Sequence, residues 1–540
     1  MASPFPDSFY PAPAGIPESC RLAGPIEQRS WLCGGAIRTW SGPQQPVLSP
    51  VCESGPGGLQ RQRIGSYPLM TAAESLQALD VASAAWAQGQ GEWPTMPVAE
   101  RIGHVAAFTA RMQEQRGEVV KRLMWEIGKS QADAEKEFDR TVEYIRNTIA
   151  ALKDLDRVSS RFVIEEGVIG QIRRSPLGVV LCMGPFNYPL NETFTTLIPA
   201  LIMGNPVLFK PPKLGVLLFE PLLAAFRDCF PAGVINTVYG DGATIVGPLM
   251  ESGRIDVLAF IGTSRVADLL RKQHPKPHRL RCVLGLDAKN PAIVLRDADL
   301  DLAVKECVLG ALSFNGQRCT ALKMIFVHEE IRAAFLDKLS AAVGALKCGM
   351  PWEAGVQITP LPEIGKTQRL QEYIEDAKAQ GGRVVNAGGG TVLETCMFPA
   401  IVYPVKPGMR LYSEEQFGPV IPVASFRDIA EPLEYIAASN FGQQVSLFGS
   451  DAAVLAGLID PLVNQVCRVN LNSQCQRGPD TFPFTGRKDS AEGTLSVSDA
   501  LRVFTIRALV AAKETGPNQQ IIKEIVTKRR SQFLSTDFIF

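Results

Sequence analysis

Histidine is scarce in this sequence, and its cysteines lack the spacing that metal and disulfide sites use. Only four histidines occur among 540 residues, and the twelve cysteines include no C-x-x-C pair. His274 and His278 are four positions apart, but Pro275 and Pro277 disfavour a helix that would bring them onto one face. The sequence therefore predicts no bound metal and no disulfide framework.

An excess of charge of either sign is also lacking. Lysine plus arginine equals aspartate plus glutamate at 55 each, and no long run carries a single sign. This balance argues against nucleic acid or a membrane surface as the main partner. The apolar stretches are all broken well before the ~20 residues that a membrane-spanning helix needs. The N-terminus has no apolar run typical of a signal peptide, so we predict a soluble, cytoplasmic protein.

The composition that is present is that of a globular protein too long for one core. Hydrophobic residues make up 46% and charged residues 20%, which excludes a disordered chain. A chain of this length is expected to form two or three domains. The first 65 residues form a loose N-terminal segment with one or two short strands near Trp31 and Trp40. Apolar residues at helical spacing predict helices around 119–127 and 138–149.

From about residue 160, short apolar runs alternate with helix-like stretches. Such runs, bounded by Gly or Pro, are typical of strands buried on both faces of a parallel sheet with crossover helices. A first set comprises 179–183, 207–209, 234–238 and 257–260. A second set comprises 292–295, 324–327, 420–423 and 445–448. We predict two α/β domains joined near residues 285–292, and a helical or polar stretch over the last forty residues.

One cysteine has neighbours that suit a nucleophile. Cys319 ends the string Asn315-Gly-Gln-Arg-Cys and precedes a predicted strand. Gly316 permits a tight turn, and the charge of Arg318 favours the thiolate that a nucleophilic cysteine needs. Taken alone, a cysteine in a polar turn is more often inert, so this string needs support from elsewhere in the chain.

Two strings place polar side chains at the ends of predicted strands, where open α/β sheets bind ligands. Asn187, in Gly-Pro-Phe-Asn-Tyr-Pro, carries an amide that can donate a hydrogen bond to an oxyanion. Lys210 and Lys213, in Lys-Pro-Pro-Lys, can meet phosphates or ribose hydroxyls. The alternative is that both strings are ordinary turns, with a turn-forming Asn and solvated lysines.

Two further strings add to the candidates for nucleotide binding. Gly262, Thr263 and Ser264 follow a predicted strand and precede a helix, and backbone amides at a helix start favour a pyrophosphate. Glu415 stands before a Gly-Pro turn, where its carboxylate can accept from ribose hydroxyls, and Phe417 lies in the same string. Each of these strings is ambiguous by itself.

Their order along the chain resembles the aldehyde dehydrogenase superfamily over roughly residues 60–500. The resemblance implies a Rossmann-like coenzyme domain, an α/β catalytic domain and a small bridging arm used in oligomerisation. It further implies that Cys319 is the nucleophile and that Asn187, with the Cys319 amide, forms the oxyanion hole. Lys210 and Glu415 would hold coenzyme ribose groups, near Phe417. Hydride transfer from the thiohemiacetal would leave a thioester.

The resemblance also implies an order of domains and an oligomer. The predicted parts are an N-terminal extension (1–65), a coenzyme-binding domain (66–155 and 173–288), a bridging arm (156–172 and 478–510), a catalytic domain (289–477) and a C-terminal tail (511–540). A homo-tetramer or homo-dimer is implied, with a small-molecule aldehyde as substrate.

Within the superfamily, the strings around Cys319 and Asn187 look like those of the non-phosphorylating glyceraldehyde-3-phosphate dehydrogenases, which use NADP and release 3-phosphoglycerate. In that branch arginines and a tyrosine bind the substrate phosphate, because arginine meets phosphate with a charged fork of donors. The matching positions are Tyr188, Arg318, Arg477 and, by a weaker match, Arg140.

The coenzyme preference follows from one position. NAD-preferring relatives commonly carry a glutamate three residues after the lysine that corresponds to Lys210, and this chain has Lys213 there. A lysine does not repel a 2′-phosphate as a carboxylate does, so NADP is favoured and NAD remains possible.

The sequence departs from the family at the residue that activates water. The family usually carries Glu-Leu-Gly-Gly-Lys, and this chain has Gly285-Leu-Asp-Ala-Lys289, with no side chain in place of the glutamate. Asp287 lies two positions later, on the same face if the backbone is extended, and is the predicted base. The alternative is an Asp that only shapes a turn.

Three functions are therefore compatible with the sequence. The first is hydrolytic oxidation of an aldehyde, with glyceraldehyde 3-phosphate and NADP as the best pair and another aldehyde as the alternative. The second is an acylating dehydrogenase that releases the acyl group to coenzyme A. The third is a nucleotide-binding scaffold without turnover.

Overall fold

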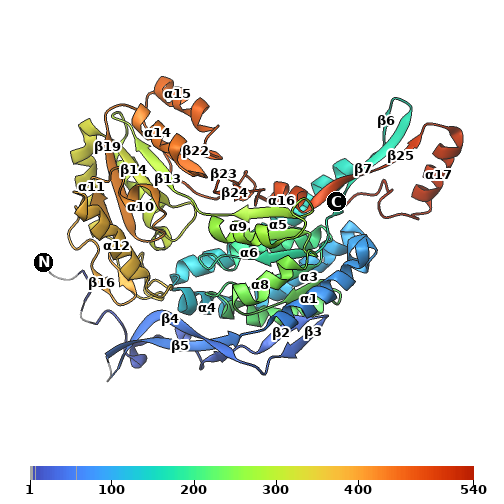
Figure 1. Ribbon diagram of the computed structural model, residues 1–540, viewed down its shortest axis with the longest axis horizontal. Helices are drawn as coiled ribbons and strands as arrows, with labels where there is room; N and C mark the ends of the chain where they lie inside the picture. Colours follow the sequence, from blue (N-terminus) through green and yellow to red (C-terminus); the bar gives the residue numbers. More distant parts are fainter. Residues whose placement is uncertain (1–3, 7, 56–57, 540) are drawn as a thin grey trace.

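The computed structural model describes residues 4–6, 8–55 and 58–539 and shows two α/β units with a projecting arm (Figure 1). The first unit is built on a sheet with the strand order β10-β9-β8-β11-β12-β24, parallel except for β24. Its strands are β8 (Val180–Met183), β9 (Val207–Lys210), β10 (Ile235–Thr237), β11 (Val257–Ile261), β12 (Arg281–Gly285) and β24 (Ala491–Glu492). Each strand predicted in this half of the chain is confirmed.

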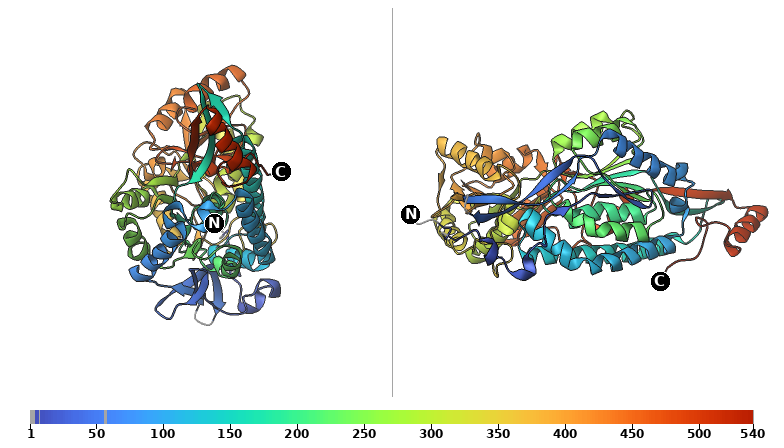
Figure 2. Two further views of the ribbon diagram at one scale, coloured as in Figure 1. Left: turned by 90° about the vertical axis from the view of Figure 1, so that its right-hand side faces the viewer. Right: turned by 90° about the horizontal axis from the view of Figure 1, so that it is seen from below.

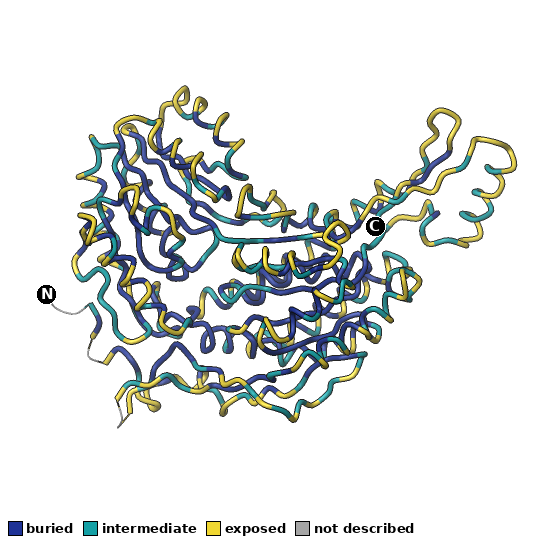
Figure 3. The backbone as a smooth tube through the Cα atoms, in the orientation of Figure 1, coloured by how far each residue is buried: buried dark blue, intermediate teal, exposed yellow. Residues whose placement is uncertain are grey.

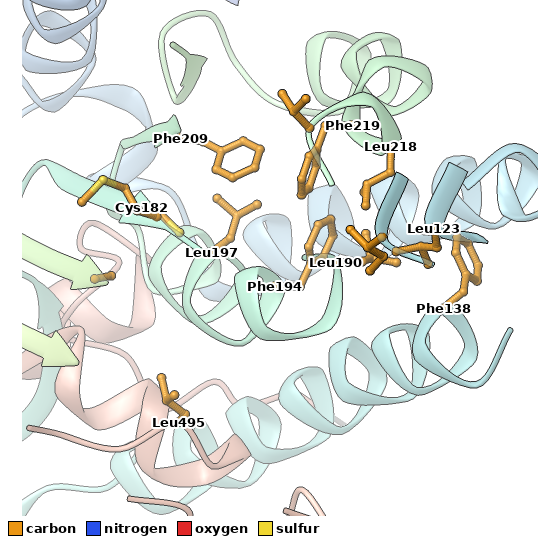
Figure 4. Packing of buried hydrophobic residues seen from close by; sticks show 14 of the residues in the cluster. Leu123, Phe138, Cys182, Leu190, Phe194, Leu197, Phe209, Leu218, Phe219 and Leu495 are labelled. Carbon is orange, nitrogen blue, oxygen red and sulfur yellow. The ribbon is translucent and has the colours of Figure 1, made fainter. Parts of the chain in front are cut away.

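Apolar helices and strands meet in the core of the first unit. Figure 4 shows Phe194 and Leu197 of α6 (Asn191–Ile202) near Phe209 of β9 and Phe219. The rings of Phe209 and Phe219 meet edge to face, with their centroids 4.8 Å apart. These side chains are fully buried. The surrounding helices are α1 (Ala72–Trp86), α2 (Glu92–Thr95), α3 (Val98–Glu114), α4 (Arg116–Ile127), α5 (Gln131–Ser159), α6 (Asn191–Ile202), α7 (Leu223–Cys229), α8 (Gly242–Glu251) and α9 (Ser264–Gln273).

The two predicted helices around 119–127 and 138–149 are confirmed as α4 and part of α5. Helix α5 runs for 29 residues, but charged residues recur along its whole length between the apolar ones. Across the part of the chain that the structure describes, helices with the length and apolar character needed to cross a membrane do not occur.

The second unit has the sheet order β15-β18-β19-β14-β13-β21-β22. Its strands are β13 (Asn290–Val294), β14 (Leu322–His328), β15 (Arg383–Val384), β18 (Ala400–Tyr403), β19 (Val420–Phe426), β21 (Gln444–Phe448) and β22 (Arg468–Leu471). Its helices are α10 (Leu300–Leu312), α11 (Arg332–Gly344), α12 (Lys366–Ala379), α13 (Arg410–Ser413), α14 (Ala430–Ala438) and α15 (Ala452–Leu462). The α/β fold class and the second set of predicted strands are confirmed.

The arm is a small antiparallel sheet that projects from the first unit (Figure 1). It consists of β6 (Val163–Glu165), β7 (Val168–Pro176) and β25 (Thr505–Lys513), and α17 (Gly516–Thr527) lies beyond it. Figure 3 shows that this region is far more exposed than the two sheets. Segment 478–510 divides between two sheets, because β24 joins the first sheet and only β25 enters the arm. Part of the last forty residues is thus a strand, where we expected helix or polar chain.

The N-terminal segment lies along one side of the first unit, as Figures 1 and 2 show. The short strands expected near Trp31 and Trp40 are the hairpin of β2 (Ser30–Cys33) and β3 (Ala36–Thr39). A longer sheet that the sequence did not suggest combines β1 (Ile26–Glu27), β4 (Gln44–Gly55) and β5 (Gly58–Pro68). The segment is therefore more regular than expected, and β4 packs against α4.

Candidate active site

The loop that carries Cys319 has an unusual backbone. After α10 the chain turns through Phe314, Asn315 and Gly316 with φ values of 48°, 56° and 71°. A left-handed conformation costs a non-glycine residue of the order of 1–3 kcal/mol and persists only where surrounding contacts impose it. A side chain at position 316 would lie 2.7 Å from the carbonyl oxygen of Gly418, so glycine is required there. These constraints hold Cys319 in a defined position before β14.

The Cys319 thiol is affected by charges from both α/β units. Burial raises its pKa above the ordinary value, the charge of Glu192 adds to this rise, and Lys323 and Arg477 lower the pKa in part. The Cys319 carbonyl accepts hydrogen bonds from Asn290 Nδ2 at 2.8 Å and from Lys323 Nζ at 3.2 Å. Formation of the thiolate therefore works against burial, with two cations near enough to favour it.

Asn187 connects the first unit to this loop. It lies between β8 and α6, and its Nδ2 donates to the carbonyl of Gln317 at 2.8 Å, two residues before Cys319. This bond uses one of the two amide hydrogens, and the other is left for a ligand. The two strings that the sequence singled out, 130 residues apart, thus meet at one place.

A buried ion pair that sequence reasoning missed fixes the turn around Asn187. Lys129 and Glu137 pair with no solvent exposure, and Lys129 Nζ donates to the Asn187 carbonyl at 2.8 Å. Glu137 Oε1 accepts from the amides of Leu190 and Asn191 at 3.0 and 3.1 Å, where α6 begins. Burial lowers the pKa of Lys129 even beside this carboxylate. The only sequence signal was a lysine after the Gly128 helix break.

Two of the predicted phosphate-binding arginines are already paired with carboxylates. Arg140 donates to both oxygens of Asp480 at 2.8 and 2.7 Å. Arg477 shares Asp480 at 3.1 Å and also pairs with Glu192. Burial opposes the charge of Arg477, but Glu192 and Asp480 together raise its pKa. These two arginines and two carboxylates form a cluster with no net charge.

Tyr188 and Arg318, the other two substrate candidates, lie beside this cluster. Burial raises the pKa of Tyr188, and the charges of Arg318 and Arg140 oppose that rise, so both guanidinium groups act on the same ring. Lys129 Nζ lies 3.5 Å from the Tyr188 ring centroid. Arg318 Nη2 donates to the carbonyl oxygens of Leu309 at 3.1 Å and Gly310 at 2.8 Å. The structure therefore brings the four predicted residues to one region.

Among the residues predicted to bind the coenzyme, Lys210 is a buried cation and the last residue of β9. Its Nζ donates to the Pro211 carbonyl at 3.3 Å, and it forms no ion pair with any residue that the structure describes. Burial, followed by the charge of Lys213, lowers the pKa of Lys210 to about 8. Lys213 is exposed and pairs with Asp241 at 3.2 Å. A phosphate or a hydrogen-bonding hydroxyl is the kind of partner that Lys210 lacks.

The turn before α9 is shaped as a helix start, but a carboxylate already caps it. A Cβ on Gly262 would lie 2.3 Å from Cζ of the Phe260 ring, so a larger residue there would require that ring to move. Thr263 is the N-cap residue of α9. The amide and hydroxyl of Ser264 both donate to Asp287 Oδ2, at 2.7 and 2.9 Å. Asp287 is thus directed to this helix start.

The remaining coenzyme candidates lie beside Cys319. Glu415 pairs with Lys323 and accepts from the Ala288 amide at 3.3 Å. Burial raises the pKa of Glu415, against the opposing charge of Lys323. Phe417 has a φ of 44°, and its ring meets Phe186 edge to face at 5.9 Å. Glu415 and Phe417 therefore border the nucleophile loop from the second unit.

Gly285, which stands where relatives have a glutamate, faces other side chains. A Cβ at this position would lie 3.2 Å from Leu495 Cδ1 and 3.4 Å from Ile261 Cγ1. Any side chain there would require these neighbours to move by a few tenths of an ångström.

Comparisons with known proteins identify the family of this chain. The aldehyde dehydrogenase family model matches residues 56–510. An NADP-dependent glyceraldehyde-3-phosphate dehydrogenase from Streptococcus equinus is 33% identical over 468 residues, covering 84% of this chain and 93% of the relative. One from Nicotiana plumbaginifolia is 31% identical, covering 77% and 84%.

A solved structure adds a match in three dimensions. The NADP complex of the NADP-dependent glyceraldehyde-3-phosphate dehydrogenase from Bacillus halodurans C-125 superposes with a TM-score of 0.81 at 29% identity. The match covers 90% of this chain and 100% of that chain. The resemblance predicted from the sequence strings is confirmed, and the chain belongs to the aldehyde dehydrogenase family.

Proposed function

We propose that this protein oxidises glyceraldehyde 3-phosphate to 3-phosphoglycerate with NADP, through a thioester on Cys319. The observation that carries the proposal is the hydrogen bond from Asn187 to the Gln317 carbonyl, which brings an amide donor to the nucleophile loop. Cysteine as nucleophile and a fixed amide donor are the two parts that acyl chemistry at an aldehyde carbon needs.

In the acylation step the Cys319 thiolate attacks the aldehyde carbon and the carbonyl oxygen becomes an oxyanion. The free amide hydrogen of Asn187 and the Cys319 backbone amide stabilise that charge. NADP supplies the hydride acceptor. Lys323 and Arg477 favour the thiolate before the attack, because their charges oppose the rise in pKa that burial causes. The product of this step is the thioester.

The residues at the coenzyme end suit a nucleotide phosphate. Lys210 is a buried cation without a carboxylate partner among the described residues, and Gly262 lets the chain pass close to the Phe260 ring before α9. Lys213 offers a second positive charge at an exposed position, suited to a 2′-phosphate. The relatives from Streptococcus equinus and Nicotiana plumbaginifolia, by name NADP-dependent, support the same coenzyme. Asp287, which caps α9, limits how closely a pyrophosphate approaches Ser264.

The substrate assignment is supported by Arg140, Tyr188, Arg318 and Arg477, which surround one region beside Cys319. Because Arg140 and Arg477 already pair with Asp480, a substrate phosphate has to share or replace this carboxylate. The glyceraldehyde-3-phosphate dehydrogenase names of the relatives point to the same substrate.

A second candidate function follows from Gly285, which has no side chain to activate water. In this alternative the thioester is released to coenzyme A, and the enzyme is an acylating dehydrogenase. Asp287, the base that the sequence indicates, stays a prediction. A homo-dimer or homo-tetramer formed through the exposed arm, and a cytoplasmic location, are likewise proposals.

The test is reduced-coenzyme formation by the purified protein with glyceraldehyde 3-phosphate, without phosphate, arsenate or coenzyme A. Steady turnover that is faster with NADP than with NAD is the expected result. One turnover per site that becomes continuous only on adding coenzyme A would favour the acylating alternative. Activity with other aldehydes and none with this one would contradict the substrate assignment.

A further inference from the structure

Hydrolysis of the thioester needs a base. At the position where relatives carry a glutamate for this purpose, this chain has Gly285, which has no side chain. Two other carboxylates near the nucleophile loop are engaged elsewhere. Asp287 Oδ2 accepts two hydrogen bonds from Ser264 at the start of α9. Glu415 pairs with Lys323 and accepts from a backbone amide. A third carboxylate, Glu192, is likewise held at one oxygen, but its partner is Arg477, on the Asn187 side of the nucleophile loop.

Glu192 lies in the first turn of α6, five residues after Asn187, and is only 7% exposed. One oxygen, Oε2, pairs with Arg477 Nη1. The other oxygen, Oε1, accepts no hydrogen bond from any residue within the described part of the chain. A buried carboxylate held at one oxygen and open at the other can orient a water molecule and accept its proton.

The contacts of Arg477 place Glu192 near the space that a side chain on Gly285 would enter. A Cβ on Gly285 would lie 3.2 Å from Leu495 Cδ1. The carbonyl of the same Leu495 accepts from Arg477 Nη2 at 3.1 Å, and Nη1 of this guanidinium pairs with Glu192. One leucine and one guanidinium therefore separate the missing side chain from the carboxylate of Glu192.

The same carboxylate is close to the nucleophile. Among the charged groups, Glu192 contributes most to the raised pKa of the Cys319 thiol, whereas Asp287 and Glu415 have no comparable influence on it. Asn187 and Tyr188, which contact Gln317 and Phe314 of the nucleophile loop, lie on the turn that leads directly into the helix of Glu192.

We propose that Glu192 is the general base of the deacylation step, a role that rests on the proposed thioester chemistry. A water oxygen attacks the thioester carbon while Glu192 Oε1 takes the water proton. The tetrahedral intermediate then loses its C–S bond, the electron pair leaves on Cys319 as thiolate, and the acid departs. Glu192 afterwards returns its proton to solvent. Arg477 acts as a positioning residue that keeps the carboxylate turned toward the thiol.

Glu192→Gln tests the proposal because glutamine keeps the size of the side chain and an oxygen for Arg477. We expect one equivalent of NADPH per site at nearly the wild-type rate, followed by steady turnover about 10²–10⁴-fold slower, the usual contribution of a general base. Hydroxylamine, which attacks a thioester without a base, should restore continuous turnover. A loss of the first equivalent, or steady turnover like that of the wild type, would overturn the proposal.

Glu192→Asp distinguishes loss of the base from misfolding of the glutamine variant, because aspartate keeps the carboxylate. The shorter carboxylate should sustain slow continuous hydrolysis, faster than that of Glu192→Gln. Equal steady rates in the two variants would show that the carboxylate does not act as the base. Asp480→Asn is the matched control, since Asp480 also pairs with Arg477. It should weaken substrate binding and raise KM, but turnover should continue beyond the first equivalent.

An activated ester separates this proposal from the proposed substrate. Hydrolysis of p-nitrophenyl acetate requires acylation and deacylation of Cys319 but neither glyceraldehyde 3-phosphate nor NADP. The wild type should release nitrophenolate continuously, and Glu192→Gln should release one equivalent and then stall. If the wild type hydrolyses the ester but does not oxidise glyceraldehyde 3-phosphate, only the substrate assignment fails. A stall in Asp287→Asn instead of Glu192→Gln would assign the base to Asp287.

Discussion

The two ends of the candidate site balance their charges in opposite ways. At the coenzyme end, Lys210 is buried with only a backbone carbonyl as partner, and its pKa falls to about 8. At the substrate end, Arg140 and Arg477 are matched by Asp480 and Glu192. One end therefore keeps a cation available for a ligand, and the other holds its cations in internal ion pairs.

The difference indicates what each end contributes. A buried cation without a counter-charge gains most from an anion, so the coenzyme end supplies affinity. A neutral cluster of ion pairs holds its members in fixed positions, and breaking one pair leaves the other charge exposed to an apolar environment. The ion pairs at the substrate end thus fix the positions of their own side chains, Glu192 among them.

The largest expected effect comes from removing the cation that serves two carboxylates. Arg477→Met leaves Glu192 without its partner, and loss of one member of a buried pair typically costs about 3–5 kcal/mol. We expect a decrease of that order in the free energy of unfolding, measured by urea denaturation. Arg140→Met should cost clearly less, because the Arg140 side chain is 26% exposed. A larger loss in Arg140→Met than in Arg477→Met would contradict this view of the cluster.

The second-largest effect is expected from Asn187, whose amide donates to the nucleophile loop. Asn187→Ala should lower kcat by about 10²–10³-fold, as expected for one oxyanion donor. The slowed step should be formation of the first equivalent of NADPH, measured by stopped flow, with a small change in KM. A variant with a normal first equivalent and slow later turnover would place Asn187 outside the acylation step.

A smaller effect should follow from the charge of Lys210. Since its pKa is about 8, the ammonium form dominates at pH 7 and is largely lost at pH 9. A bound phosphate raises that pKa, so binding takes up a proton, and NADP affinity should be greatest below pH 8 and fall above it. We expect a rise in Kd of up to about tenfold between pH 7 and pH 9. Lys210→Met should bind NADP weakly with no such dependence, and an unchanged pH profile would refute the role.

The smallest effect concerns the exposed lysine. Lys213 is paired with Asp241 and open to solvent, where charge interactions are screened. Lys213→Glu should reduce the preference for NADP over NAD by a few-fold to about tenfold, through repulsion of the 2′-phosphate. The ratio of kcat/KM for the two coenzymes measures this. An unaltered ratio would mean that another residue reads the 2′-phosphate.

Local strings predicted the parts of this site that depend on neighbouring residues. Cys319, Asn187 and Lys210 stand at strand ends or in tight turns that Gly and Pro mark in the sequence. The apolar runs of β8, β9 and β14 likewise predicted buried strands, because burial on both faces demands continuous apolar residues.

Contacts between distant segments were beyond such reasoning. Glu192 and Arg477 are 285 residues apart, and neither string shows that one will neutralise the other. The β25 strand pairs with β7, more than 300 residues earlier, and its alternation of apolar and charged residues is too weak to distinguish it from a helix. Gly285 in the sequence showed that the usual glutamate is missing, but only the fold shows that Glu192 lies near this position, through Arg477 and Leu495.

The most direct test of the account is the identity of the covalent intermediate. Glu192→Gln is mixed with glyceraldehyde 3-phosphate and NADP, quenched with acid after the first equivalent of NADPH, and digested for peptide mass spectrometry. The account predicts a 3-phosphoglyceryl group on the peptide that contains Cys319, and neither adduct nor NADPH in Cys319→Ala. NADPH formation by Cys319→Ala, or an acyl group on another residue, would contradict it.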